Sequence, residues 1–171
     1  SANLDKVAGY VFLSPEAYRG AGQFMFNLPC VPGEKAEVKG DAKTRFDISG
    51  SKFYQQYHEV DVLLENANKE LRDYEASLNQ RIKNGETQQT IMAEYEQKAP
   101  ALQKAKDDKI FNFVKQHHDY ESCATIFEQF YDVIKMEKLL GLLSENVKNG
   151  RMKAFYQPMI DMAKKRAEAV E

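Results

Sequence analysis

Residues 51–85 read SKFYQQYHEVDVLLENANKELRDYEASLNQRIKNG, and this stretch decides most of the fold. Apolar and aromatic residues recur in it at alternating steps of four and three: Phe53, Tyr57, Val60, Leu64, Ala67, Leu71, Tyr74 and Leu78. This spacing places them on one stripe of a helix that packs lengthwise against a partner. Ser51 is a suitable N-cap, and Asn84-Gly85 has the residue types that end helices. The sequence therefore predicts one long helix between these two points.

A second apolar stripe follows the predicted turn at residues 83–86. Its members are Met92, Tyr95, Ala99, Leu102, Ile110, Phe113 and Val114. The shortest way to bury both stripes is an antiparallel helical hairpin, in which each helix covers the other. Pro100 falls inside the second helix, and its ring clashes with the carbonyl four residues earlier. We therefore expect a kink or a break near Ala99.

Residues 4–50 have a different character from the helical part. Short runs rich in Val, Phe and Tyr alternate there with Gly and Pro, which is typical of β structure. We expect strands near residues 9–14, 23–30, 34–40 and 45–49, joined in one antiparallel sheet. Pro32-Gly33 predicts a turn, because Pro presets φ at the first central position and Gly permits a positive φ at the second.

The C-terminal part predicts three shorter helices, at about 121–133, 135–147 and 151–169, with Asn149-Gly150 as the stop before the last. The expected fold is therefore α+β: an N-terminal antiparallel sheet of about four short strands, a long helical hairpin and three shorter helices. We divide it into a β-rich subdomain, residues 1–50, and a helical subdomain, residues 51–171. Together they form one structural domain.

Composition excludes several classes of function. The chain has 24 Lys and Arg against 26 Asp and Glu, without a basic segment, so we expect no nucleic-acid partner. The apolar runs are all much shorter than the roughly 18 residues that a membrane-spanning helix needs. Motifs for phosphate binding and hydrolysis, such as GxGxxG, GxSxG and HExxH, are also missing from the sequence.

Two cysteines, Cys30 and Cys123, are far apart and form no CxxC motif. The first interpretation is that both are structural thiols, since a buried Cys behaves as a small hydrophobic residue. The second is a disulfide between them, which requires an oxidising compartment. The third is a reactive Cys123, because Ser122 looks like an N-cap and a helix N-terminus lowers a thiol pKa.

The histidines do not form a convincing metal site. His117 and His118 are adjacent, so on a helix they point about 100° apart, and His58 is the one further histidine. The carboxylates are spread over amphipathic faces beside Lys and Arg, as in Glu65 and Lys69. The sequence thus predicts no catalytic residue, no metal site and no cofactor.

Four tyrosines are the candidate interaction residues: Tyr54, Tyr57, Tyr74 and Tyr95. Tyrosine combines an apolar ring with a polar tip and is favoured at interfaces, so Tyr54 and Tyr57 could line a docking groove between the sheet and the hairpin. The alternative is packing in the core with the hydroxyl reaching water.

Three segments resemble a known family. They are VPGEKAEVKG at 31–40, FDISGSKFY at 46–54 and FNFVKQHHDYES at 111–122. Together they resemble the N-terminal domain of unknown function that precedes the thioredoxin-like module in envelope thiol-disulfide oxidoreductases and peroxiredoxin-like proteins of Gram-negative anaerobes. The resemblance extends over about residues 9–165. His118 stands where that family has proline.

The resemblance implies a noncatalytic accessory domain in the periplasm or cell envelope, in a longer protein that is often lipid-anchored. Its partner would be a thioredoxin-like domain in the same chain or an envelope client protein. Two alternatives remain: a standalone interaction or scaffold domain of the envelope without a redox role, and a small enzyme that uses Cys123 with His117 or His118.

Overall fold

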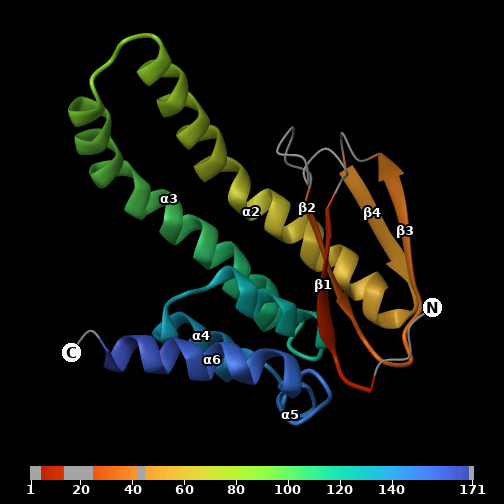
Figure 1. Ribbon diagram of the computed structural model, residues 1–171. Helices are drawn as coiled ribbons and strands as arrows, with labels where there is room; N and C mark the ends of the chain where they lie inside the picture. Colours follow the sequence, from red (N-terminus) through yellow and green to blue (C-terminus); the bar gives the residue numbers. More distant parts are fainter. Residues whose placement is uncertain (1–4, 14–24, 42–44, 170–171) are drawn as a thin grey trace. The chain divides into compact units, whose positions relative to one another are not determined.

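The computed structural model describes residues 5–13, 25–41 and 45–169 (Figure 1). Helices and antiparallel strands are both present, which confirms the α+β class. Its contacts group the chain into two compact units: residues 1–60 with 117–171, here called the sheet unit, and residues 61–116, the hairpin unit. This grouping differs from the division at residue 50 that we expected. The start of the long helix belongs with the strands and the C-terminal helices.

Four strands lie in the sheet unit. β1 (Ala8–Leu13) pairs antiparallel with β2 (Met25–Cys30), and β3 (Ala36–Asp41) pairs antiparallel with β4 (Arg45–Gly50). In the first pair Ala8 is opposite Cys30, and in the second Ala36 is opposite Gly50. The strand positions agree with the sequence, although expected residues 14 and 23–24 lie outside the described ones.

The prediction of one sheet is wrong, since the described strands form two separate two-stranded sheets. The backbone at the end of β2 explains the separation. The Tyr54 hydroxyl donates to the Pro29 carbonyl at 2.8 Å, and its oxygen accepts the Val31 N–H at 3.3 Å. Pro29 itself has no N–H to give to a neighbouring strand. This segment therefore bonds to a helix side chain instead of to β3.

The predicted turn between β2 and β3 is present. Glu34 N–H donates to the Val31 carbonyl at 3.1 Å, and Gly33 has a φ of 78°. Proline at the first central position and a positive φ at the second are the features of a type II turn.

The sheet unit is tied together by Arg151. Its guanidinium binds Glu121 through two bonds of 2.9 and 2.8 Å, Glu34 at 2.6 Å and the Pro32 carbonyl at 3.0 Å. Glu34 also bonds to the hydroxyl of Ser51, which accepts the Lys35 N–H at 3.0 Å. The turn after β2 is thereby fixed to residues more than 80 positions later in the chain.

The core of the sheet unit contains the start of the long helix. Phe53, Tyr54 and Val60 are all 2% exposed or less. Leu28 and Ile48 of the strands are also buried in this unit. Apolar side chains from the C-terminal helices are buried in the same unit: Ile126, Phe127, Met136, Leu139, Tyr156 and Ile160. The rings of Phe127 and Tyr156 stack with centroids 4.7 Å apart.

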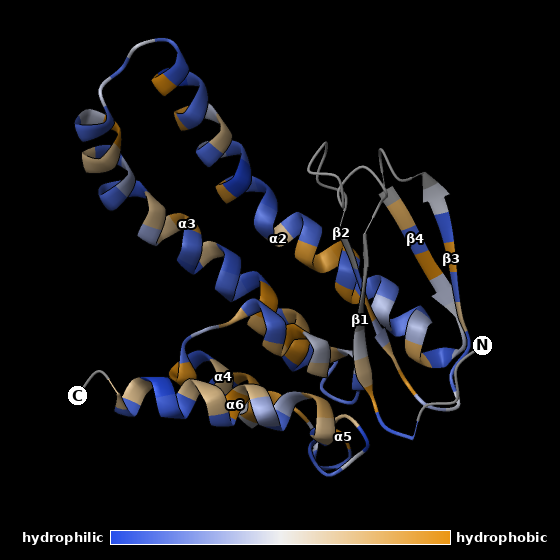
Figure 2. Ribbon diagram, in the orientation of Figure 1, coloured by the Kyte–Doolittle hydropathy of each residue, from blue (hydrophilic) through white to orange (hydrophobic). Residues whose placement is uncertain are grey.

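The hairpin unit consists of most of α2 (Lys52–Lys83) and all of α3 (Gln88–Gln116). Residues later in α2 contact residues earlier in α3: Glu70 pairs with Lys109, Tyr74 with Tyr95 and Arg81 with Glu94. The two helices are therefore antiparallel. Their surfaces are mostly hydrophilic, with hydrophobic residues at intervals (Figure 2). The helix runs through Pro100, so the alternative of a break there is wrong.

The C-terminal part departs from the three predicted helices. It consists of η1 (Glu121–Gln129), α4 (Val133–Leu142), α5 (Glu145–Lys148) and α6 (Lys153–Glu168), the first of them a 3-10 helix. Residues 122–127 are all buried, so η1 does not have the one-sided burial of a surface α-helix. Asp132 and Ser144 cap α4 and α5, at 2.7 and 3.4 Å, which divides the predicted second helix.

Candidate functional site

Tyr54 belongs to the core of the sheet unit. It is 2% exposed, and its hydroxyl is used by the bonds to Pro29 and Val31. Burial raises the pKa of this phenol. The neighbouring Tyr57 is half-buried, and its ring stacks on Phe53 with centroids 6.3 Å apart. Tyr54 is therefore a core residue, whereas the side chain of Tyr57 remains partly exposed.

Tyr74 and Tyr95 lie in the hairpin unit, where the structure brings them together. Their rings are nearly parallel, at 3°, with centroids 6.3 Å apart. The Tyr95 hydroxyl donates to Glu75 at 3.1 Å, and the Tyr74 hydroxyl donates to Glu94 at 3.3 Å. The hydrogen bond to Glu75 raises the pKa of Tyr95, because a carboxylate favours the protonated phenol. Both side chains remain half-exposed.

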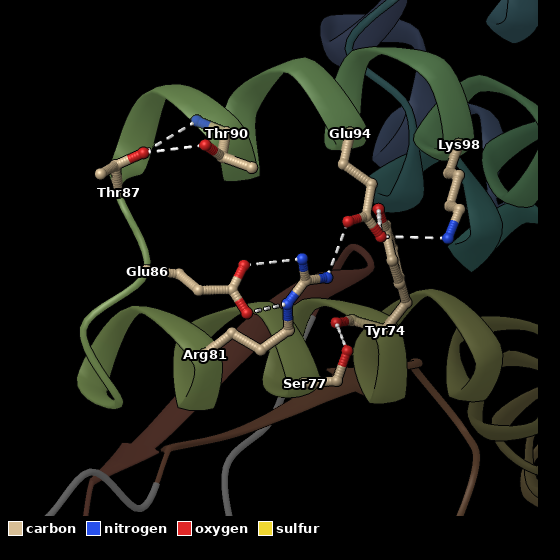
Figure 3. Close-up of polar contacts among 8 residues, drawn as sticks. All are labelled: Tyr74, Ser77, Arg81, Glu86, Thr87, Thr90, Glu94 and Lys98. Carbon is tan, nitrogen blue, oxygen red and sulfur yellow. Dashed lines mark hydrogen bonds and ion pairs between the residues drawn. The ribbon is translucent and has the colours of Figure 1, made fainter.

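A charged network includes Glu94, the hydrogen-bond partner of Tyr74 (Figure 3). Arg81 on α2 binds Glu86 through two bonds of 2.9 and 2.8 Å and reaches Glu94 on α3 at 2.7 Å. Lys98 also pairs with Glu94, at 3.0 Å, and its ammonium lies 5.8 Å from the centre of the Tyr74 ring. The hydrogen bonds from Arg81 lower the pKa of both carboxyl groups. The network joins α2 to the start of α3.

An open depression of about 370 Å³ lies at Tyr95. It is lined by Leu71 of α2 and by five residues of α3: Tyr95, Glu96, Ala99, Pro100 and Gln103. Residues 96, 100 and 103 follow helical steps of four and three, so they share one face of α3. The amide of Gln103 is fixed by a hydrogen bond to Asp107 at 3.0 Å. We call these six residues the hairpin pocket.

The sequence indicated Tyr95 but not the hairpin pocket. Its apolar lining comes from two helices, and their register determines which α3 residues face Leu71. Pro100 was the available signal, because a proline within a helix removes one backbone donor and is therefore unusual there. From the sequence, that proline predicts a kink or a break near Ala99, and neither of these indicates a pocket.

Cys123 does not have the features of a reactive thiol. It is fully buried, its thiol donates to the His117 carbonyl at 3.5 Å, and burial raises its pKa to about 12. The predicted N-cap is wrong, because Tyr120 holds that position and Ser122 lies inside η1. The Ser122 hydroxyl, also buried, has no hydrogen-bond partner in the described part of the chain.

Cys30 ends β2 and is half-buried, and burial raises its pKa as well. Both cysteines are free thiols. A protonated thiol is a weak nucleophile and a weak metal ligand. The structural role expected for Cys30 and Cys123 is consistent with these surroundings.

The histidines lie apart from any cluster of ligands. The His117 ring contacts the Tyr120 ring at 4.6 Å, His118 lies 3.6 Å from Asp119, and His58 is exposed on α2. Among residues 5–13, 25–41 and 45–169, no group of three or more His, Cys, Asp or Glu could hold a metal ion. No helix within these residues is long and apolar enough to cross a membrane.

Comparisons with known proteins give no relative. No protein-family model, no curated protein and no solved structure matches this chain.

Proposed function

We propose that this chain is a noncatalytic accessory domain whose helical hairpin binds a partner protein. The observation that carries the proposal is the hairpin pocket beside the paired rings of Tyr74 and Tyr95. Aromatic rings next to an apolar depression are the kind of surface that contributes most to protein binding.

The state of the two thiols supports a noncatalytic role in redox chemistry. Thiol-disulfide exchange starts from a thiolate, and both pKa values here are raised by burial. Cys123, with a pKa of about 12, remains protonated at neutral pH. We infer that any disulfide exchange in which this protein takes part uses cysteines of the partner.

The proposed partner is a thioredoxin-like module of an envelope thiol-disulfide oxidoreductase, or a client of such an enzyme. This step rests on the resemblance of residues 31–40, 46–54 and 111–122 to the domain that precedes such modules. On the same resemblance we propose the periplasm or cell envelope as its location. A scaffold domain without a redox partner would use the same surface, and binding experiments separate the two.

The test has two measurements on the full 171-residue chain. Turnover of insulin disulfides should be absent from this chain, and a thioredoxin-like module with an intact CxxC should bind to it in a calorimetric titration. Insulin reduction at a thioredoxin-like rate that is lost in Cys123→Ala would contradict the noncatalytic role. Absence of binding to the module would contradict the redox partner and favour the scaffold.

A further inference from the structure

The acidic residues at the hairpin pocket differ from the others of the hairpin unit. Most carboxylates there are paired with a cation: Glu65 with Arg72, Glu70 with Lys109, Asp73 with Lys69, Glu86 and Glu94 with Arg81, and Asp108 with Lys104. Glu75 accepts only the hydroxyl of Tyr95. Glu96 makes no hydrogen bond or ion pair with any described residue. Both are exposed, so two carboxylates at this pocket lack a cation.

The hairpin pocket is mostly apolar; Glu96 is part of its lining, and Glu75 is bonded to the lining residue Tyr95. Leu71, Ala99 and the ring of Pro100 contribute hydrocarbon, and Tyr95 contributes the face of its ring. Its volume, about 370 Å³, is near the lower end of the roughly 300–1,000 Å³ that specific pockets occupy. Pro100 also has no N–H to donate to the carbonyl of Glu96, so the helix has one backbone donor fewer at this point. Such a site suits a large apolar side chain with a cationic group nearby.

We propose that the hairpin pocket binds a basic amphipathic helix of the partner protein. One large apolar side chain of that helix enters the pocket, and Lys or Arg residues one turn away pair with Glu75 and Glu96. Residues 96, 100 and 103 form a stripe along α3. A helix of the partner can pack its side chains against such a stripe. The absence of cations on these two carboxylates favours a basic partner over an acidic one. This inference rests on the proposed function and specifies the chemistry of its partner.

A displayed library of helical peptides, selected against the full chain, tests the proposal. We expect enrichment of sequences with a Leu, Phe or Met anchor and a Lys or Arg three or four positions away. A synthetic copy of the most enriched peptide is then titrated against wild type and three variants. Ala99→Leu fills the pocket, Glu75→Gln with Glu96→Gln removes both charges, and Glu86→Gln is the matched control. In that control Arg81 remains paired with Glu94.

We expect the affinity for the peptide to fall about tenfold or more in Ala99→Leu and in the double charge variant, and to stay unchanged in Glu86→Gln. Added salt should weaken binding to wild type more than binding to the double charge variant. Circular dichroism verifies that each variant retains its helix content. The proposal would be overturned if acidic peptides were enriched, if no peptide were enriched, or if all variants bound the peptide equally. A second copy of the chain as occupant would show as concentration-dependent dimerisation abolished by Ala99→Leu, and would also overturn it.

These outcomes are distinguishable from failure of the proposed function. If the thioredoxin-like module binds wild type and the two pocket variants equally, the accessory role stands and the proposed occupant of the pocket is wrong. If the module does not bind but basic peptides do, the pocket chemistry stands and the redox partner is wrong.

Discussion

At the scale of single residues, Tyr54 connects two parts of the chain that are 25 positions apart. Its hydroxyl donates to Pro29 and accepts from Val31, while the ring is buried. Packing in the core was one of the two interpretations of Tyr54 from the sequence, which did not indicate the backbone groups that its hydroxyl bonds. Those partners come from β2, and a helical pattern contains no information about a strand so distant in sequence.

Tyr54→Phe should lower the free energy of unfolding by about 1–3 kcal/mol, because it leaves a buried carbonyl and a buried N–H without their partner. Urea titration followed by circular dichroism measures the change. Tyr131→Phe is the control, since Tyr131 is 83% exposed and should change stability by less than about 0.5 kcal/mol. Equal effects of the two substitutions would contradict the assigned role of Tyr54.

Cys123 makes stability depend on pH in the alkaline range. Its pKa in the folded protein is about 12, above the ordinary value of 9.0, so the unfolded chain loses the thiol proton first. The stabilisation is therefore fully present below pH 9 and is lost as pH rises toward 12. Wild type should lose more stability between pH 8 and pH 10 than Cys123→Ala, measured by urea titration at each pH. Parallel curves for the two proteins would exclude a strongly raised pKa.

At the scale of elements, agreement with the sequence was good where the pattern was local. The strands and the two long helices have the expected periodicity and end near the expected residues. The prediction failed where the outcome depended on distant partners. Two sheets replace one because the backbone at Pro29 and Val31 bonds to Tyr54, and η1 is a 3-10 helix in a stretch buried on every side.

Gly50 joins β4 to α2 in a way that no other residue type allows. Its φ is 140°, and a Cβ there would lie 1.9 Å from the Lys35 carbonyl oxygen. Gly50→Ala should therefore destabilise the protein by more than about 1 kcal/mol. Gly141→Ala is the matched control, because nothing lies within 4 Å of its Cβ and α4 should gain up to about 1 kcal/mol. Thermal unfolding of both variants checks the prediction, and a stabilised Gly50→Ala would contradict it.

Arg81 makes the hairpin sensitive to acid. It lowers the pKa of Glu86 and Glu94 in the folded protein, so the stabilisation is present above pH 4.5 and is lost as pH falls through the lowered values. Arg81→Gln should lower the melting temperature at pH 7 and have little effect at pH 2. Lys83→Gln is the control, because Lys83 is exposed and takes no part in the network of Arg81, Glu86 and Glu94. A constant difference between wild type and Arg81→Gln at both pH values would count against the network.

At the scale of the whole molecule, the chain consists of a sheet unit with an apolar core and a hairpin unit with a largely polar surface. The tyrosine pattern indicated one half of the candidate site, Tyr74 and Tyr95. It also included Tyr54, which is in the core. The hairpin pocket could not be predicted, because it requires Leu71 to lie opposite Ala99 and Pro100, and the register of two helices is set by their packing.

Site-specific photo-crosslinking to a thioredoxin-like module tests the central claim most directly. A photoreactive amino acid replaces Met92, one helical turn before the pocket residues Tyr95 and Glu96, or Met162 of α6 in the sheet unit. The two methionines are similarly exposed, at 54% and 58%, so they form a matched pair. The account predicts a crosslink from position 92 that Ala99→Leu suppresses, and none from position 162. A crosslink from position 162 alone, or from neither position, would contradict it.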